Sequence, residues 1–156
     1  MLDWPAKQQS YEDSFTFYTR IFRWAIAHFV YDTDQDVWGV PEHWDSLEDL
    51  EKLAEVHGKV IGDCDDFAQL CRHALAKLGI PSRIVICTVE NSGNARQNHA
   101  VAESPEGWVL DNRQPSVTSW PALIALGYKK DCFGPLTIAS MPMDHSITWF
   151  TEKERE

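Results

Sequence analysis

Cys64, within the stretch Gly62 to Ala68, has the residue type and the position expected of a nucleophile. Asp63 can cap a helix, and Asp66 three residues later can reach back to complete a capping box. Apolar residues then recur with the period of a helix that buries one face, and Gly79 ends it. Cys64 should therefore lie in the first turn, where unpaired backbone N–H groups and the helix dipole favour a thiolate. A cysteine is usually a small buried apolar residue, but the polar neighbours of this one favour a nucleophile.

A cysteine nucleophile needs a base for its proton, and the base needs a group that orients its ring. His99 and Asp111 are the candidates, because one predicted β-hairpin carries both. The turn between Ser104 and Trp108 has proline and glycine where they favour a type I turn followed by a glycine with positive φ, which makes a three-residue loop. With that loop His99 and Asp111 are diagonal neighbours on one face, about 7–8 Å apart at the backbone. A two-residue loop would instead put His99 on a face with Asn112.

Metal and disulfide sites find less support in the sequence. The spacings typical of zinc ligands, C-x-x-C and H-x-x-x-H, do not occur. The four cysteines do not resemble a disulfide framework, since Cys64 and Cys71 would lie about 10 Å apart along one helix. We expect no cofactor to be required.

The composition limits the class of protein. A chain of 156 residues suits one domain over residues 1–156 with a single core. Its net charge of −10 argues against a nucleic-acid partner, because phosphate binding requires a basic surface. No segment approaches the roughly 20 apolar residues of a membrane span. The first residues lack the pattern of a signal peptide, so we expect a cytoplasmic location, with the periplasm as the alternative if a signal was removed.

The periodicity predicts an α+β fold, in which N-terminal helices and the central nucleophile helix pack on an antiparallel sheet, with the site along one edge. We expect Lys59 to Ile61 to be a linker. The first predicted helix covers 9–30 and has a buried stripe of Phe15, Tyr18, Phe22, Ile26 and Phe29. A second helix covers Leu47 to His57 and is capped by Ser46, and a short helix runs from Ser119 to Gly127. Strands are predicted over 83–89, 98–103, 108–112 and 136–139.

The order of these motifs resembles that of the bacterial transglutaminase-like cysteine proteinases, which belong to the transglutaminase-like superfamily of papain-type folds. The resemblance covers roughly residues 20 to 130 and rests on the following set, in order: Trp44 with Leu47, Gly62 to Ala68, Gly79-Ile80-Pro81, His99-Ala100-Val101 and Leu110-Asp111-Asn112.

The resemblance implies a papain/transglutaminase-like fold and a cysteine peptidase that acts through a thioester on a protein or peptide. By resemblance, Cys64 is the nucleophile, His99 the base and acid, and Asp111 the orienting carboxylate. We expect the oxyanion to be held by the Cys64 backbone N–H and by the indole N–H of Trp44.

Four points remain open at this stage. The acyl group could pass to an amine, as in transglutaminases, or the fold could serve as a non-catalytic assembly or binding module. The resemblance also implies calcium at Asp63 and Asp65, although Asp63 and Asp66 are already explained as caps. A small stand-alone protein of this kind could also be phage-encoded and virion-associated.

Overall fold

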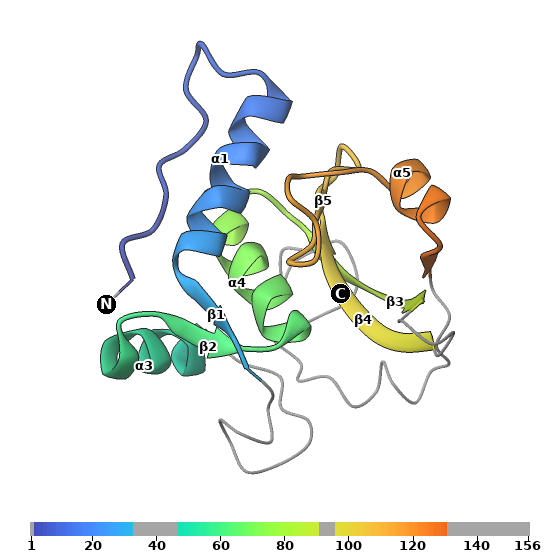
Figure 1. The fold of residues 1–156 in the computed structure, drawn as a ribbon. Helices are drawn as coiled ribbons and strands as arrows, with labels where there is room; N and C mark the ends of the chain where they lie inside the picture. The colour runs from blue at the N-terminus through green and yellow to red at the C-terminus, as the bar shows by residue number, and fades with distance from the viewer. Residues whose placement is uncertain (1, 33–46, 91–95, 131–156) are drawn as a thin grey trace, which may run out of the picture.

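A computed structural model of the chain describes residues 2–32, 47–90 and 96–130, and it confirms the α+β fold. Figure 1 shows helix α4 lying between α1 and the sheet formed by β3, β4 and β5. The helices and strands, in chain order, are α1 (Ser14–Ala27), β1 (Phe29–Tyr31), α3 (Leu47–His57), β2 (Val60–Gly62), α4 (Cys64–Lys77), β3 (Arg83–Glu90), β4 (Arg96–Glu103), β5 (Val109–Leu110), α5 (Trp120–Ala125) and β6 (Lys129–Lys130).

Helix α4 is the centre of the hydrophobic core. Its residues Phe67, Leu70 and Leu75 are buried, and they belong to one cluster with the α1 residues Phe17 and Ile21. The burial of these side chains on both flanks of α4 fixes the helix relative to α1 and to the sheet, since fully buried side chains of this size each contribute about 1.5–3 kcal/mol. The start of α4, where Cys64 lies, is thereby held rigidly.

The main sheet is antiparallel and has the strand order β5-β4-β3-β6. Strands β3 and β4 pair along their whole length, and Cys87 lies opposite His99. β4 also packs against α4, so the side chains on one face of this strand approach the nucleophile helix. This arrangement brings the two predicted catalytic segments together, although they are far apart in the sequence.

The first helix is shorter than the 9–30 predicted, and its buried face is rotated. Asp13 caps α1, because its carboxylate accepts the Thr16 N–H at 2.8 Å, and the helix ends at Ala27. The predicted stripe is right for Tyr18 and Phe22, but Phe15 and Ile26 are exposed. Tertiary packing against α4 selects the face with Phe17 and Ile21 in their place.

The prediction that Lys59 to Ile61 form a linker is wrong, because most of this segment belongs to strand β2. β2 pairs in parallel with β1, with Phe29 opposite Val60. Aromatic and β-branched residues in both segments favour this pairing over continuation of the first helix. As a consequence, β2 runs directly into the cap of α4.

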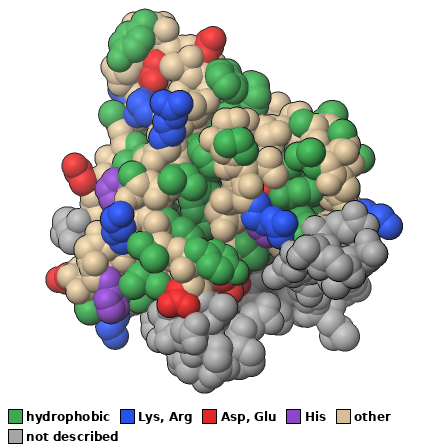
Figure 2. All heavy atoms as spheres, in the orientation of Figure 1, with side chains coloured by type: hydrophobic (Ala, Val, Ile, Leu, Met, Phe, Trp, Pro, Cys, Tyr) green, Lys and Arg blue, Asp and Glu red, His purple; other side chains and the backbone are tan. Residues whose placement is uncertain are grey.

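The remaining predictions mostly agree with the structure. α3 has the bounds predicted, and α5 follows the Ser119 cap, whereas the strand β6 was not predicted and the second hairpin strand is only Val109–Leu110. The predicted Ser46 cap and the strand over 136–139 lie outside the described residues. Within the described part of the chain, no helix is long and apolar enough to cross a membrane, and Cys64, Cys71 and Cys87 are free thiols. On the face shown in Figure 2, Lys and Arg side chains are scattered and form no single patch.

Candidate active site

Cys64 is the first residue of α4, as predicted. The preceding Asp63 has the extended backbone of an N-cap, and the capping box with Asp66 is present. The return half of the box is a bond of 2.9 Å from the Asp63 N–H to Asp66 Oδ2. The backbone N–H of Cys64 therefore lies in the first turn, where the helix itself supplies no acceptor. The Cys64 side chain is partly exposed, so a substrate can reach it.

Gly62 makes this cap possible because a side chain at its position would collide with the box. A Cβ atom built on Gly62 would lie 2.2 Å from Asp66 Oδ2 and 2.5 Å from Asp66 Cβ. Contacts below 3.0 Å essentially never occur for a real Cβ, so any larger residue would displace Asp66. Glycine is thus required at position 62 because the Asp66 side chain packs directly against its backbone.

The hairpin has the three-residue loop predicted. The Ser104 N–H donates to the Trp108 carbonyl at 2.9 Å, the Gly107 N–H donates to the Ser104 carbonyl at 3.0 Å, and Gly107 has a φ of +91°. The pairing of Ala102 with Leu110 fixes the register. Because side chains alternate along strands, the number of residues in the loop decides which residue after β5 faces the same side as His99.

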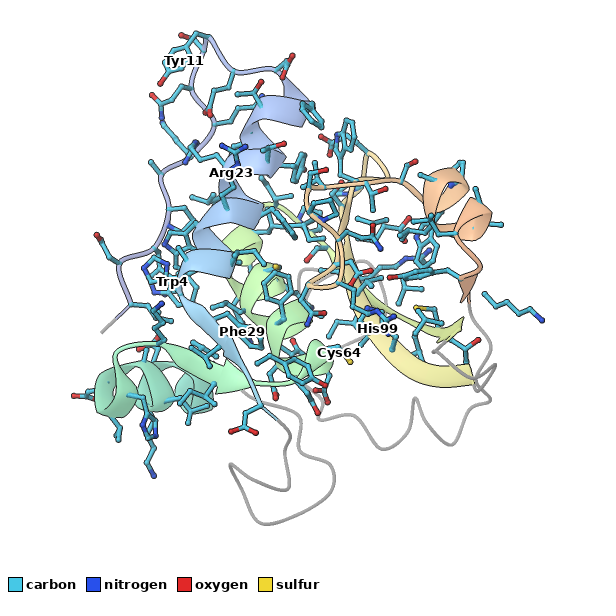
Figure 3. All side chains as sticks on the ribbon, in the orientation of Figure 1. Trp4, Tyr11, Arg23, Phe29, Cys64 and His99 are labelled. Carbon is cyan, nitrogen blue, oxygen red and sulfur yellow. The ribbon has the colours of Figure 1, made fainter. Side chains whose placement is uncertain are left out.

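His99 and Asp111 are joined by a short hydrogen bond. The distance from His99 Nε2 to Asp111 Oδ1 is 2.6 Å, and both side chains are buried. An ionised carboxylate only accepts, so Nε2 carries the hydrogen and Nδ1 is the ring nitrogen left for Cys64. The Cys64 side chain interacts with this ring and favours its charged form. Figure 3 shows Cys64, at the start of α4, close to His99 on β4.

The surroundings favour a charged imidazolium beside a charged carboxylate. Burial lowers the pKa of His99, but hydrogen bonds to Asp111 and Cys64 more than offset it and raise the pKa to about 9. Burial raises the pKa of Asp111, but the bonds from His99, the Tyr128 hydroxyl and the Arg113 N–H outweigh this and leave its pKa below the usual value. His99 is therefore protonated at neutral pH, next to an ionised Asp111.

Tyr128 contacts both of these residues, and the sequence reasoning missed it. Its hydroxyl donates to Asp111 Oδ2 at 2.5 Å, and its ring lies edge-on to the His99 ring with centroids 6.0 Å apart. Gln114 Nε2 donates to the Tyr128 oxygen at 3.2 Å. The one available signal was the predicted helix end at Gly127. It places Tyr128 directly after a helix but does not indicate which residue Tyr128 contacts.

Three carboxylates lie beside the nucleophile. Single oxygens of Asp63, Asp65 and Asp66 all lie within 4.8 Å of one another, and Asp65 and Asp66 are buried. The Asp66 N–H donates to Asp65 Oδ1 at 3.0 Å. Hard oxygen donors gathered in this way suit a calcium ion.

Trp44, the expected second oxyanion donor, lies outside the described residues. His28 has a structural role, since its ring stacks on Trp24 and its Nδ1 lies 2.7 Å from the Trp24 carbonyl oxygen. His57 ends α3.

Comparison with known families gives a match over most of the chain. The family model described as bacterial transglutaminase-like cysteine proteinase BTLCP matches residues 5–124. The matched segment includes Cys64, His99 and Asp111, and it stops before Tyr128. No curated protein matches the chain.

Proposed function

Because the chain belongs to the bacterial transglutaminase-like cysteine proteinase family, we propose that it is a thiol peptidase with Cys64 as nucleophile, His99 as acid and base, and Asp111 as the orienting carboxylate. One observation carries this proposal: the buried His99 ring is bonded through Nε2 to Asp111 and also interacts with Cys64. A histidine held between a carboxylate and a thiol is the arrangement that general acid–base and nucleophilic catalysis require.

Acylation begins from a Cys64 thiolate and a His99 imidazolium. The thiolate sulfur attacks the carbonyl carbon of the substrate amide and forms a tetrahedral intermediate. The carbon–nitrogen bond then breaks, and His99 gives its proton to the leaving amine. The enzyme is left as a Cys64 thioester with a neutral imidazole, which remains bonded to Asp111.

Deacylation restores the starting state. His99 takes a proton from water, and the resulting hydroxide attacks the thioester carbonyl. The carbon–sulfur bond breaks, the acid product leaves, and the thiolate and imidazolium are regenerated. Asp111 keeps its charge throughout and stabilises the imidazolium at both ends of the cycle.

The oxyanion of each tetrahedral intermediate needs donors that are already in place. The Cys64 N–H suits this role because the helix supplies no acceptor for it. The second donor proposed is the indole N–H of Trp44. Replacing Trp44 by Phe should lower kcat by about 10²-fold or more with little change in KM, and an unchanged kcat would remove Trp44 from the mechanism.

Calcium is proposed to bind at Asp63 and Asp65, as the family resemblance implies. The gathering of their oxygens with those of Asp66 fits a hard cation. When bound, the ion would supply positive charge that compensates the carboxylates flanking the nucleophile, and no step of the reaction passes through it.

The decisive test is Cys64→Ala with Cys71→Ala as its matched control. Both variants remove a thiol from α4, but Cys71 is fully buried in the core. Peptide or protein cleavage should be abolished in Cys64→Ala, with the melting temperature within a few degrees of wild type, and retained in Cys71→Ala below its melting temperature. Cleavage by Cys64→Ala would end the proposal.

Two further measurements separate the alternatives for the same site. Incubation with substrate and a labelled primary amine distinguishes hydrolysis from transfer, because incorporation of the label would identify the amine as acceptor. Iodoacetamide should label Cys64 near pH 6 faster than it labels an ordinary thiol. Equal rates would favour a non-catalytic module of the same fold.

A further inference from the structure

Asp111 carries hydrogen bonds on both oxygens, and the two sides are occupied differently. His99 Nε2 at 2.6 Å and the Arg113 N–H at 2.9 Å both donate to Oδ1. Within the described chain, the donor to Oδ2 is the Tyr128 hydroxyl, at 2.5 Å. The side chain of Asp111 has no exposed surface, so water does not take the place of a missing donor. The orientation of the carboxylate plane therefore depends on Tyr128.

Local backbone structure holds Tyr128 in this position. α5 ends in a Schellman motif, in which the Gly127 N–H donates to the Ile124 carbonyl and the Tyr128 N–H donates to the Leu123 carbonyl. Gly127 has a φ of +99°, a conformation that glycine adopts without strain. Tyr128 and Leu123 share one buried cluster, and β6 begins at the next residue and pairs with β3. The ring is thus fixed from both sides along the chain.

The direction of the hydroxyl hydrogen is also fixed. Gln114 Nε2 donates to the Tyr128 oxygen, which leaves the phenolic hydrogen free to point at Asp111. Burial and the bond to Asp111 raise the pKa of Tyr128, so the hydroxyl keeps its hydrogen. The bonds form one chain from Gln114 through Tyr128 and Asp111 to His99.

We propose that Tyr128 is a positioning residue of the active site, which holds the Asp111 carboxylate in the plane that directs Oδ1 at His99. This inference rests on the proposed function and adds to its triad a residue from a segment beyond residues 5–124. Without the hydroxyl, Oδ2 is a buried charged oxygen with no donor among the described residues, and the carboxylate rotates toward the donors that remain on Oδ1. The bond to His99 lengthens as a result.

Several titratable groups face this pair from the neighbouring elements. Cys64 lies at the start of α4 against the His99 ring, and the buried Cys71 thiol of the same helix interacts with the Asp111 charge. The Cys87 thiol on β3 donates to the His99 backbone carbonyl at 3.5 Å, away from the ring. Tyr128→Phe leaves all of these thiols in place.

The test compares Tyr128→Phe with Tyr18→Phe. Tyr18 is a matched control because it is also buried and its hydroxyl also donates to a carboxylate, but that carboxylate belongs to Glu106, at 3.0 Å, and not to Asp111. Tyr128→Phe should lower kcat roughly tenfold with KM within about twofold, and should move the basic limb of the kcat profile about one pH unit lower. Tyr18→Phe should do neither. Equal kcat profiles for the two variants would overturn the proposal.

A second measurement needs no substrate and so separates this proposal from the peptidase proposal. The Nε2 hydrogen of His99 should give a far-downfield proton resonance in wild type and Tyr18→Phe, and this resonance should move upfield or broaden in Tyr128→Phe. An unchanged resonance would exclude the positioning role even if cleavage is lost. Conversely, a changed resonance together with cleavage by Cys64→Ala would refute the peptidase mechanism alone.

Gln114→Leu keeps the test decisive if Tyr128→Phe does not fold. Gln114 is only partly buried, and its loss leaves the phenol in place but frees the hydroxyl to rotate. The resonance and the pH profile should shift in the same direction as for Tyr128→Phe, and by less. If the resonance and the pH profile of Gln114→Leu equal those of wild type, the chain of hydrogen bonds from Gln114 to His99 does not position Asp111.

Discussion

Replacing Asp111 by Asn tests how much the carboxylate charge contributes to His99. The substitution keeps the shape of the side chain, because an amide oxygen can still accept from His99 Nε2 and an amide N–H can donate to the Tyr128 oxygen. The negative charge is lost, and the bond with Tyr128 reverses direction, because in wild type the Tyr128 hydroxyl donates to Asp111 Oδ2. His99 then keeps the effect of burial, which lowers its pKa, and loses the bond to an ionised partner.

The size of the effect follows from the pKa of His99. The pKa is about 9 in the folded protein, and the ordinary value is 6.5. The folded state therefore binds the proton more tightly than the unfolded chain, and this difference corresponds to about 3 kcal/mol of folding free energy. The sign follows from the raised pKa: this stability is fully present below pH 6.5 and is lost as the pH rises through 9.

Urea unfolding followed by tryptophan fluorescence at several pH values between 5.5 and 10 measures the loss. Wild type should lose about 3 kcal/mol of unfolding free energy over this interval, and Asp111→Asn should lose much less. His57→Gln is the control, since it removes an exposed imidazole at the end of α3 and leaves Asp111 untouched. If the pH dependence is equally steep in wild type and Asp111→Asn, the coupling between His99 and Asp111 does not have the strength argued above.

Two more predictions concern the cap of α4. Gly62→Ala should destabilise the protein by about 1–3 kcal/mol and slow iodoacetamide labelling of Cys64, because the new Cβ displaces Asp66; Gly79→Ala, where a Cβ meets no atom, should leave the labelling rate unchanged. Calcium added after chelation should raise the melting temperature by at least about 3 °C in wild type but not in Asp65→Asn, and a wild-type melting temperature that ignores calcium would rule out the proposed ion.

The parts of the site that could be predicted from the sequence are those set by short-range rules. The cap at Asp63 is decided within four residues, and so is the loop between Ser104 and Trp108. The number of residues in the loop sets the pairing register of the two strands. That register then places Asp111 on the same face of the hairpin as His99. No knowledge of the core was needed for this step.

The parts that were missed depend on contacts between distant segments. The end of α1 could not be placed because Phe29 fits a helical stripe equally well, and only pairing with Val60 decides for a strand. Tyr128 lies 17 residues after Asp111, and nothing in the intervening sequence states that the two meet. Propensity and periodicity describe one segment at a time, whereas the end of α1 and the partner of Tyr128 are decided by contacts between two segments.

The geometry at His99 is sensitive to single residues for the same reason. Asp111 faces His99 only because the hairpin loop has three residues, and a one-residue change would turn Asn112 to that side. Tyr128 reaches Oδ2 only because α5 ends at a glycine with positive φ. Each of these turns is stabilised by its own hydrogen bonds, so the arrangement of charge around His99 is fixed before any substrate binds. A preorganised carboxylate of this kind stabilises an imidazolium without reorganisation during the reaction, which is the condition for acid–base catalysis by a buried histidine.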